Sequence, residues 1–260
     1  MTLIVTYINK YGIVHASDSN LSYSNGLHAG ESQKTFPIPH LESGLTVAGS
    51  YQVGGNPMNR WLNSFIDHDM KSGNKSLELF SEKLRVKLEM EMNGGEKKSG
   101  CMIHVAGFAP GNNVKHPEFW FIRNIYGIDQ KSGEYQEVRN QFVKSEDFWV
   151  RNSKDLDLLN WLEGGGIQVY GNGFASGRIG FFSLLPHFNE YFQTFWSNPN
   201  WKFRPPTSIK ETEHIVKLYI QMVKTLFLVS DYPSPLIGGE IQTYLIPRAN
   251  NRLQPTLTRR

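Results

Sequence analysis

The stretch TLIVTYINKYGIVHASDS, residues Thr2 to Ser19, indicates how the fold begins. Thr2 to Ile8 is β-branched and apolar, which is typical of a strand. Asn9 to Gly12 supplies turn residues, and Ile13 to Ser19 is a second short apolar run. We therefore expect an antiparallel hairpin at the start of the chain.

This hairpin places chemistry-bearing residues near one another. A turn centred on Lys10 puts Thr2 opposite Asp18, and a second turn near Gly26 puts Asp18 opposite Lys34. Because paired strands lie about 5 Å apart, we expect Thr2, Asp18 and Lys34 in one row across three strands. The register could slip by a residue or two, and the loop after Ser19 could hold a small hairpin of its own.

Further along the chain, short strands alternate with helical patterns. Strands are expected at 32–38, 45–49, 102–108, 119–122, 166–170 and 241–246. A first helix is expected at 56–70. A second would begin after a cap at Ser76 and stop at Gly94-Gly95, and a third would begin near Ser208, where Glu211 completes a capping box. This order favours an α+β sandwich, two sheets with helices outside them, in one domain.

The composition divides the chain into a body and a tail. Residues 1–247 form the expected single domain, with an aromatic insertion at about 184–206 that packs on the body or on a neighbouring subunit. Residues 248–260 carry four Arg and no acid, so we expect a basic, flexible tail. Since the body is near neutral, no basic face for a nucleic acid is expected.

Several classes of protein are disfavoured. The single cysteine, Cys101, excludes an intrachain disulfide, and the eight scattered His residues show no metal-ligand spacing, so neither a metal nor a cofactor is expected. No run of about 18 apolar residues predicts a membrane span, and the N-terminus lacks the features of a signal peptide. We expect a cytoplasmic protein.

Thr2 is the residue with the most distinctive chemistry. If Met1 is removed, Thr2 carries a hydroxyl and an α-amine on one residue. The amine has a reference pKa of about 7.7–8.0, which suits a general base, and the hydroxyl needs such a base to become a nucleophile. Asp18 would hold Lys34, whose charge would lower the pKa of the Thr2 amine and hydroxyl.

The segment from Thr2 to Ser50 resembles the start of a mature proteasome β-type subunit, as in bacterial proteasome-like members of the N-terminal-nucleophile (Ntn) hydrolase superfamily. That family begins with Thr, has an Ala-x-Asp-Ser motif, matched here by Ala16 to Ser19, and then a Lys. The gaps from Thr2 to Asp18 and from Asp18 to Lys34 are both 16 residues, as in the family. The resemblance implies a four-layer αββα sandwich of two antiparallel sheets flanked by helices.

The resemblance also implies further site residues. Gly49 of the Ala-Gly pair would supply the oxyanion-hole amide, and Asn172, in place of a family Ser, would position the amine together with Ser19. Near Gly238-Gly239 the family has an Asp and a Ser, where this chain has Ser234 and Ile237. The pocket beside the nucleophile would be lined by Leu21, Ser32, Val47 and Tyr51.

These features predict a threonine-type endopeptidase or amidohydrolase that cleaves a peptide or protein substrate through a Thr acyl-enzyme. Two alternatives remain open: an inactive scaffold subunit of a proteasome-like ring, and a transpeptidase or acylase on the same fold. The resemblance implies a homo-oligomer, a ring or a stack, and leaves any unfoldase partner unidentified.

Overall fold

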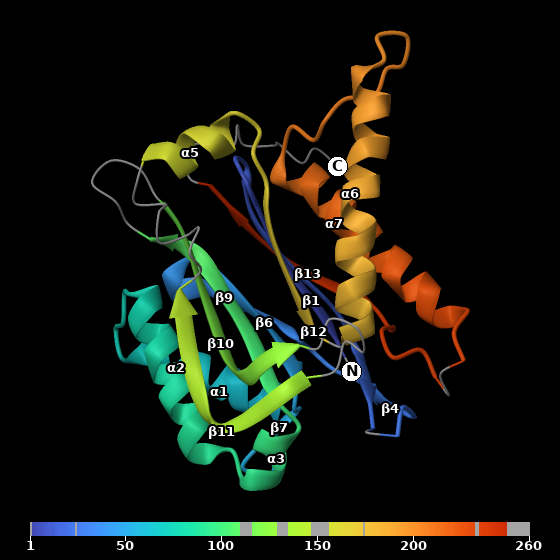
Figure 1. Cartoon of the computed structure of the whole chain (residues 1–260). Helices are drawn as coiled ribbons and strands as arrows, with labels where there is room; N and C mark the ends of the chain where they lie inside the picture. Colours follow the sequence, from blue (N-terminus) through green and yellow to red (C-terminus); the bar gives the residue numbers. More distant parts are fainter. Residues whose placement is uncertain are drawn as a thin grey trace, which may run out of the picture.

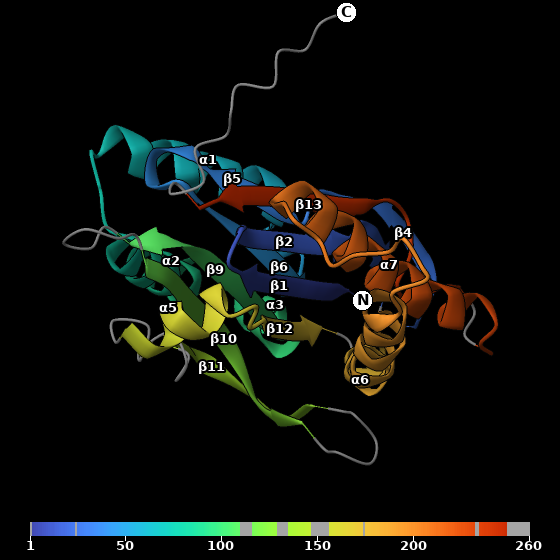
Figure 2. The same cartoon turned by 90° about the horizontal axis from the view of Figure 1, so that it is seen from above.

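Two antiparallel sheets form the centre of the protein, and helices cover their outer faces (Figures 1 and 2). The computed structural model describes residues 2–23, 25–109, 116–128, 135–146, 156–173, 175–231 and 234–248. The fold is therefore a mixed α/β arrangement built on antiparallel sheets, as expected.

The first sheet has the strand order β12-β1-β2-β13, from β1 (Leu3–Asn9), β2 (Gly12–Asp18), β12 (Gln168–Gly173) and β13 (Ile241–Pro247). The second has the order β11-β10-β9-β6-β5, from β5 (Thr35–Ile38), β6 (Ser43–Gly49), β9 (Cys101–Ala109), β10 (His116–Ile128) and β11 (Tyr135–Glu146). Two small ribbons pair β3 (Asn20–Ser22) with β4 (His28–Glu31) and β7 (Gln52–Val53) with β8 (Asn56–Pro57). The helices are α1 (Met58–Lys71), α2 (Leu77–Glu91), α3 (Gly94–Lys98), α5 (Leu156–Glu163), α6 (Ala175–Ser197) and α7 (Ile209–Leu228), with one 3₁₀ turn, η1 (Pro39–Leu41).

The alternation of β1 explains how the layers pack. Leu3, Val5 and Tyr7 join a core cluster with α7, whereas Ile4 packs with Ala48 of the second sheet. Successive strand residues point to opposite faces, so β1 is buried on both sides. On the far side of the second sheet, α1 and α2 bury a cluster that includes Leu62, Phe80, Leu84 and Leu88.

Two helix starts follow the predicted caps. Ser76 Oγ accepts a hydrogen bond from Leu79 N at 3.2 Å, and Ser208 Oγ accepts one from Glu211 N, also at 3.2 Å. The second half of the predicted capping box differs, because the Glu211 carboxylate accepts from Thr207 N. Both caps satisfy amide groups that the first helical turn leaves unpaired.

Several predicted boundaries were wrong. Helix α2 ends at Glu91, and Gly94-Gly95 begins α3 instead of stopping α2, since Asn93 caps it. The strand expected at 32–38 covers only Thr35–Ile38. Strand β12 is shifted toward the C-terminus and contains Gly171 to Gly173, which we had placed after it.

Other elements were missed or differ in kind. Strand β11 and helix α5 were not predicted. The aromatic insertion is helical as far as Ser197, because α6 runs through it despite Pro186. Arg248, assigned to the flexible tail, is buried and pairs with Glu163, while residues 249–260 lie outside the described residues. Among the helices of the described residues, none is both long and apolar enough to cross a membrane.

A buried carboxylate fastens α7 to the first sheet. Glu213 accepts hydrogen bonds from Thr243 Oγ1 and Lys210 Nζ, both at 2.6 Å, and pairs with Lys217 Nζ at 2.7 Å. Burial raises the pKa of Glu213, but these partners outweigh burial and lower the pKa to about 2. This carboxylate therefore stabilises the fold above its unfolded pKa, and the stabilisation is lost as the pH falls toward 2.

Glu213→Gln is therefore expected to destabilise the protein at neutral pH and to lose that effect in acid. The difference in unfolding free energy between wild type and variant should shrink as the pH falls from about 4.5 toward 2, since 4.5 is the ordinary pKa of Glu. Urea unfolding at several pH values measures it. A difference that stays constant over this range would contradict the role given to the charge of Glu213.

Candidate active site

The register of the first hairpin differs by one residue from the prediction. Ile4 pairs with Ser17, so Leu3, and not Thr2, lies opposite Asp18. The cause is the turn: Asn9 pairs with Gly12, so the loop has an even number of residues and its centre falls after Lys10. Leu3 N donates a hydrogen bond to Asp18 Oδ1 at 2.9 Å, which ties the backbone next to Thr2 to this carboxylate.

The predicted row across three strands was also wrong. Asp18 pairs with Ile241 of β13, so β13 lies next to β2 where the strand with Lys34 was expected. The residues between form the separate β3–β4 ribbon, and Lys34 directly precedes β5 of the second sheet. Lys34 therefore approaches Asp18 from the facing sheet.

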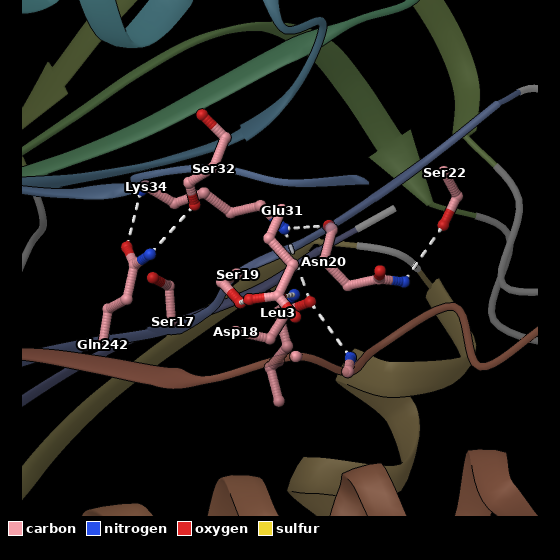
Figure 3. A network of polar contacts seen from close by, with 12 residues as sticks. Leu3, Ser17, Asp18, Ser19, Asn20, Ser22, Glu31, Ser32, Lys34 and Gln242 are labelled. Carbon is pink, nitrogen blue, oxygen red and sulfur yellow. Dashed lines mark hydrogen bonds and ion pairs between the residues drawn. The ribbon is translucent and has the colours of Figure 1, made fainter. Parts of the chain in front are cut away.

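Asp18 and Lys34 nevertheless meet. Lys34 Nζ lies 3.4 Å from Asp18 Oδ2, and both side chains are fully buried. The same ammonium donates to Asn20 O, and Gly238 N donates to Asp18 Oδ2 at 3.2 Å. Figure 3 shows Leu3, Asn20 and Lys34 around Asp18. The Gly-Gly loop before β13 thus contributes through its backbone.

Burial shifts the pKa values of this pair. Burial lowers the pKa of Lys34, opposed by the attraction of Asp18, and raises the pKa of Asp18, opposed by Lys34 and by the amides of Leu3 and Gly238. A lysine with a lowered pKa is closer to the working pH of a general base. Burial and the ion pair therefore act in opposite directions on the pKa of each group.

Gln242, which the sequence analysis missed, holds the backbone around Lys34. Its Oε1 accepts from Lys34 N at 2.7 Å and from Thr35 N at 3.3 Å, and its Nε2 donates to Ser32 O at 2.9 Å. The side chain comes from β13 of the first sheet (Figure 3). The signal available in the sequence was a polar residue, Gln242, inside the strand expected at 241–246.

Thr2 lies at the start of β1, and only 4% of it is exposed. The alternation of β1, continued back by one residue, directs Thr2 to the same face as Ile4 and Thr6, between the sheets. The Asp18 carboxylate accepts a hydrogen bond from Leu3 N, the backbone amide directly after Thr2. The structure therefore pairs Asp18 with Lys34 and ties Asp18 to the backbone next to Thr2.

Gly173 approaches Thr2 closely enough to explain why this position is glycine. A Cβ built on Gly173 would lie 1.9 Å from Thr2 O, and its φ of 135° is one that other residues rarely adopt. Gly173→Ala is therefore expected to push back the start of β1. Unfolding free energy should fall by about 1–3 kcal/mol, and any activity that depends on Thr2 should fall with it.

Paired measurement of stability and turnover checks this, with Gly165→Ala as the control. Gly165 also has a positive φ, of 95°, but a Cβ there meets nothing within 4 Å. The control should therefore lose stability without a selective loss of turnover. Equal turnover in Gly173→Ala and in the control would contradict the coupling of Gly173 to Thr2.

Gly49 ends β6, beside Ala48, which packs against Ile4. It is exposed and has a φ of 100°, and a Cβ there would lie 2.2 Å from Gly100 O. Gly49 pairs with Cys101 of β9 in the second sheet.

The two predicted amine-positioning residues have other partners. Ser19 Oγ donates to Glu31 Oε2 at 2.6 Å and accepts from Glu240 N at 2.7 Å. The Asn172 amide lies 2.8 Å from His104 Nε2. Ser234, at the place of the family Asp, donates to Gly26 O at 2.6 Å.

The predicted pocket residues fall into two groups. Ser32 Oγ donates to Tyr51 Oη at 3.1 Å, and Tyr51 donates in turn to Gln33 O. Val47 is fully buried in the cluster under α1 and α2, against which Tyr51 also packs. Leu21 is half-buried in β3, where it pairs with Gly30 of β4.

No protein-family model and no curated protein matches this chain.

Proposed function

We propose that this chain is an N-terminal threonine amide hydrolase with the Ntn-hydrolase fold, which cleaves peptide bonds through a Thr2 acyl-enzyme. The observation that carries the proposal is the buried Asp18–Lys34 pair, 3.4 Å apart, with Asp18 bound to the amide directly after Thr2. A buried ion pair costs desolvation free energy, and strongly perturbed ionisable groups are concentrated at functional sites. The layers of helix, sheet, sheet and helix are compatible with that fold.

Each group has a role in the proposed reaction. Thr2 Oγ1 attacks the substrate carbonyl carbon, and its proton passes to the neutral Thr2 α-amine or to Lys34 Nζ in its deprotonated form. The Gly49 amide stabilises the oxyanion, a contribution of about 3–4 kcal/mol in related acyl transfer. The C–N bond then breaks, the amine leaves with that proton, and water hydrolyses the ester to restore Thr2.

An inactive scaffold subunit is the second candidate. It is favoured by the engagement of Ser19 with Glu31 and of Asn172 with His104, which differs from the predicted roles of Ser19 and Asn172 at the amine. A transpeptidase would use the same acyl-enzyme, with an amine in place of water. In each case we propose a homo-oligomeric assembly.

Turnover of a panel of fluorogenic peptide amides separates these functions. The hydrolase should release the fluorogenic amine and the free acid, whereas a transpeptidase given an added amino-acid amide should yield the new peptide bond. A protein with Met1 removed that forms neither product with any member of the panel would be the scaffold.

A further inference from the structure

The segment that carries Lys34 departs from the second sheet where it meets Gln242. Lys34 O accepts a hydrogen bond from Val47 N of β6 at 2.9 Å, as in an antiparallel ladder. The two residues of such a pair exchange both of their backbone bonds in a regular ladder, so Lys34 N would face Val47 as well. In this protein Lys34 N donates to Gln242 Oε1 of β13 at 2.7 Å, and Thr35 N donates to the same oxygen at 3.3 Å.

Two consecutive amides that converge on one oxygen require a bent backbone. Along an extended strand, neighbouring residues alternate in direction. Successive amides point to one place only where the chain turns, as in the concave backbone nests that bind anions. Strand β5 begins at Thr35, directly after these converging amides begin. The bend therefore lies at Lys34.

The bend changes the face to which the Lys34 side chain points. Phe36 lies in the core cluster under α1 and α2, and the alternation of a regular strand would direct Lys34 to that same face. Thr35 points the other way, since its Oγ1 lies 2.8 Å from Ser17 Oγ of the first sheet. Lys34 Nζ nevertheless lies 3.4 Å from Asp18, also in the first sheet. Without the bend, Lys34 would point away from Asp18.

The Gln242 amide binds this segment as a neighbouring strand would. While its Oε1 accepts from Lys34 N, its Nε2 donates to Ser32 O at 2.9 Å (Figure 3). A carbonyl and the N–H two residues later are groups that a strand presents on one side. Ser17 is the cross-strand neighbour of Gln242. Two adjacent side chains of the first sheet, Ser17 and Gln242, therefore contact residues 32–35.

We propose that Gln242 is a positioning residue for Lys34: its amide holds the backbone bent at Lys34 and thereby turns the Lys34 amine from the second sheet toward Asp18. The bend rests on the contacts above. Its importance for catalysis rests on the proposed function, in which Lys34 Nζ is one of the two groups that accept the Thr2 proton. Gln242 contacts the backbone on both sides of Lys34 and acts on the reaction through Lys34.

Amine labelling tests the bend without any measurement of activity. Gln242→Met keeps the length of the side chain but removes its acceptor and its donor. The Lys34 amine should then leave Asp18 and reach solvent, since an amine without a partner is not stable among apolar side chains. Wild-type Lys34 is fully buried, so acetic anhydride should label it much more slowly than the exposed lysines. Its labelling rate, followed by mass spectrometry after proteolysis, should rise at least about 10-fold in Gln242→Met.

Two controls separate the bend from a general loss of stability. Gln168→Met makes the same change in β12 of the same sheet, where Gln168 pairs with Ile8. Glu213→Gln removes a charge that fastens α7, and urea brings it to the unfolding free energy of Gln242→Met. Lys34 should stay protected in both controls.

Two labelling results would overturn the proposal. One is a Lys34 that stays protected in Gln242→Met, and the other is a Lys34 that is labelled equally fast in either control. Gln242→Asn provides a milder variant should Gln242→Met fail to fold. It keeps an amide but is one methylene too short to bind Ser32 O and Lys34 N together, so the same rise in labelling is expected and the same results would contradict it.

Kinetics test the role of Gln242 in the reaction. In Gln242→Met, kcat should fall by about 10- to 100-fold with KM unchanged, because Lys34 is displaced while the substrate contacts remain. Gln168→Met should keep both constants. If Lys34 is labelled as expected but kcat is unchanged, Gln242 has no positioning role in catalysis. If Lys34 is labelled as expected and wild type forms no product at all, the proposed function fails and the bend stands.

Discussion

Thr2→Ala is expected to abolish amide hydrolysis while the protein stays folded. The substitution removes the only atom that forms the acyl-enzyme in the proposed reaction, and loss of a nucleophile costs on the order of 10⁴- to 10⁶-fold in kcat. The fold should tolerate it, because the contact to Asp18 comes from Leu3 N, a backbone group that alanine at position 2 leaves in place. Initial rates on a peptide amide, with circular dichroism and urea unfolding, measure both effects.

Thr2→Ser is the matched control for this substitution. It keeps a hydroxyl and an amine on the first residue of the processed chain, so hydrolysis should be reduced but detectable. Intact mass must show that Met1 is removed in both variants. Full activity in Thr2→Ala would exclude Thr2 as the nucleophile, whatever the geometry around it.

Lys34→Met is expected to cost both stability and activity. The substitution leaves Asp18 buried without its cation, and removing one partner of a buried pair typically costs about 3–5 kcal/mol. Lys83→Met is the matched control, because Lys83 Nζ lies 3.0 Å from buried Asp69 but its side chain is 40% exposed. An exposed partner contributes less than about 1 kcal/mol. Urea unfolding of the two variants should therefore differ by several kcal/mol.

A double variant separates the two losses. In Lys34→Met with Asp18→Asn no buried charge remains unpaired, so part of the unfolding free energy should return. Hydrolysis should stay absent, because the Lys34 amine that the proposed reaction uses is still missing. Recovery of hydrolysis in the double variant would show that Lys34 acts only through stability.

The sequence predicted the parts of the fold that follow from local patterns. The apolar stripe of α2 and its Ser76 cap were predicted because helical periodicity and capping are short-range properties. By contrast, β11 was missed, since its polar sequence has no strong alternation and it stands at the end of the strand order of its sheet, beside β10. Helix α6 was missed because Pro186 and a run of aromatic residues resemble an irregular segment.

The candidate site was predicted in composition but not in geometry. The equal spacing of Thr2, Asp18 and Lys34 identified the Asp18–Lys34 pair that the structure forms, yet the strand that follows Lys34 belongs to the other sheet. No local pattern specifies which sheet a strand joins, because that choice depends on long-range pairing. The roles of Gln242 and His104 were missed for the same reason, since their partners lie on distant strands.

Intact mass spectrometry with an N-terminal-threonine-reactive epoxyketone tests the central claim most directly, because this reagent needs both a free amine and a hydroxyl on one residue. We expect the purified protein to lack Met1 and to gain the mass of one reagent, with the modification on Thr2 after proteolysis. Thr2→Ala should gain none. Protein that retains Met1 and still hydrolyses peptide amides, or processed protein that hydrolyses them but gains no reagent on Thr2, would contradict the account.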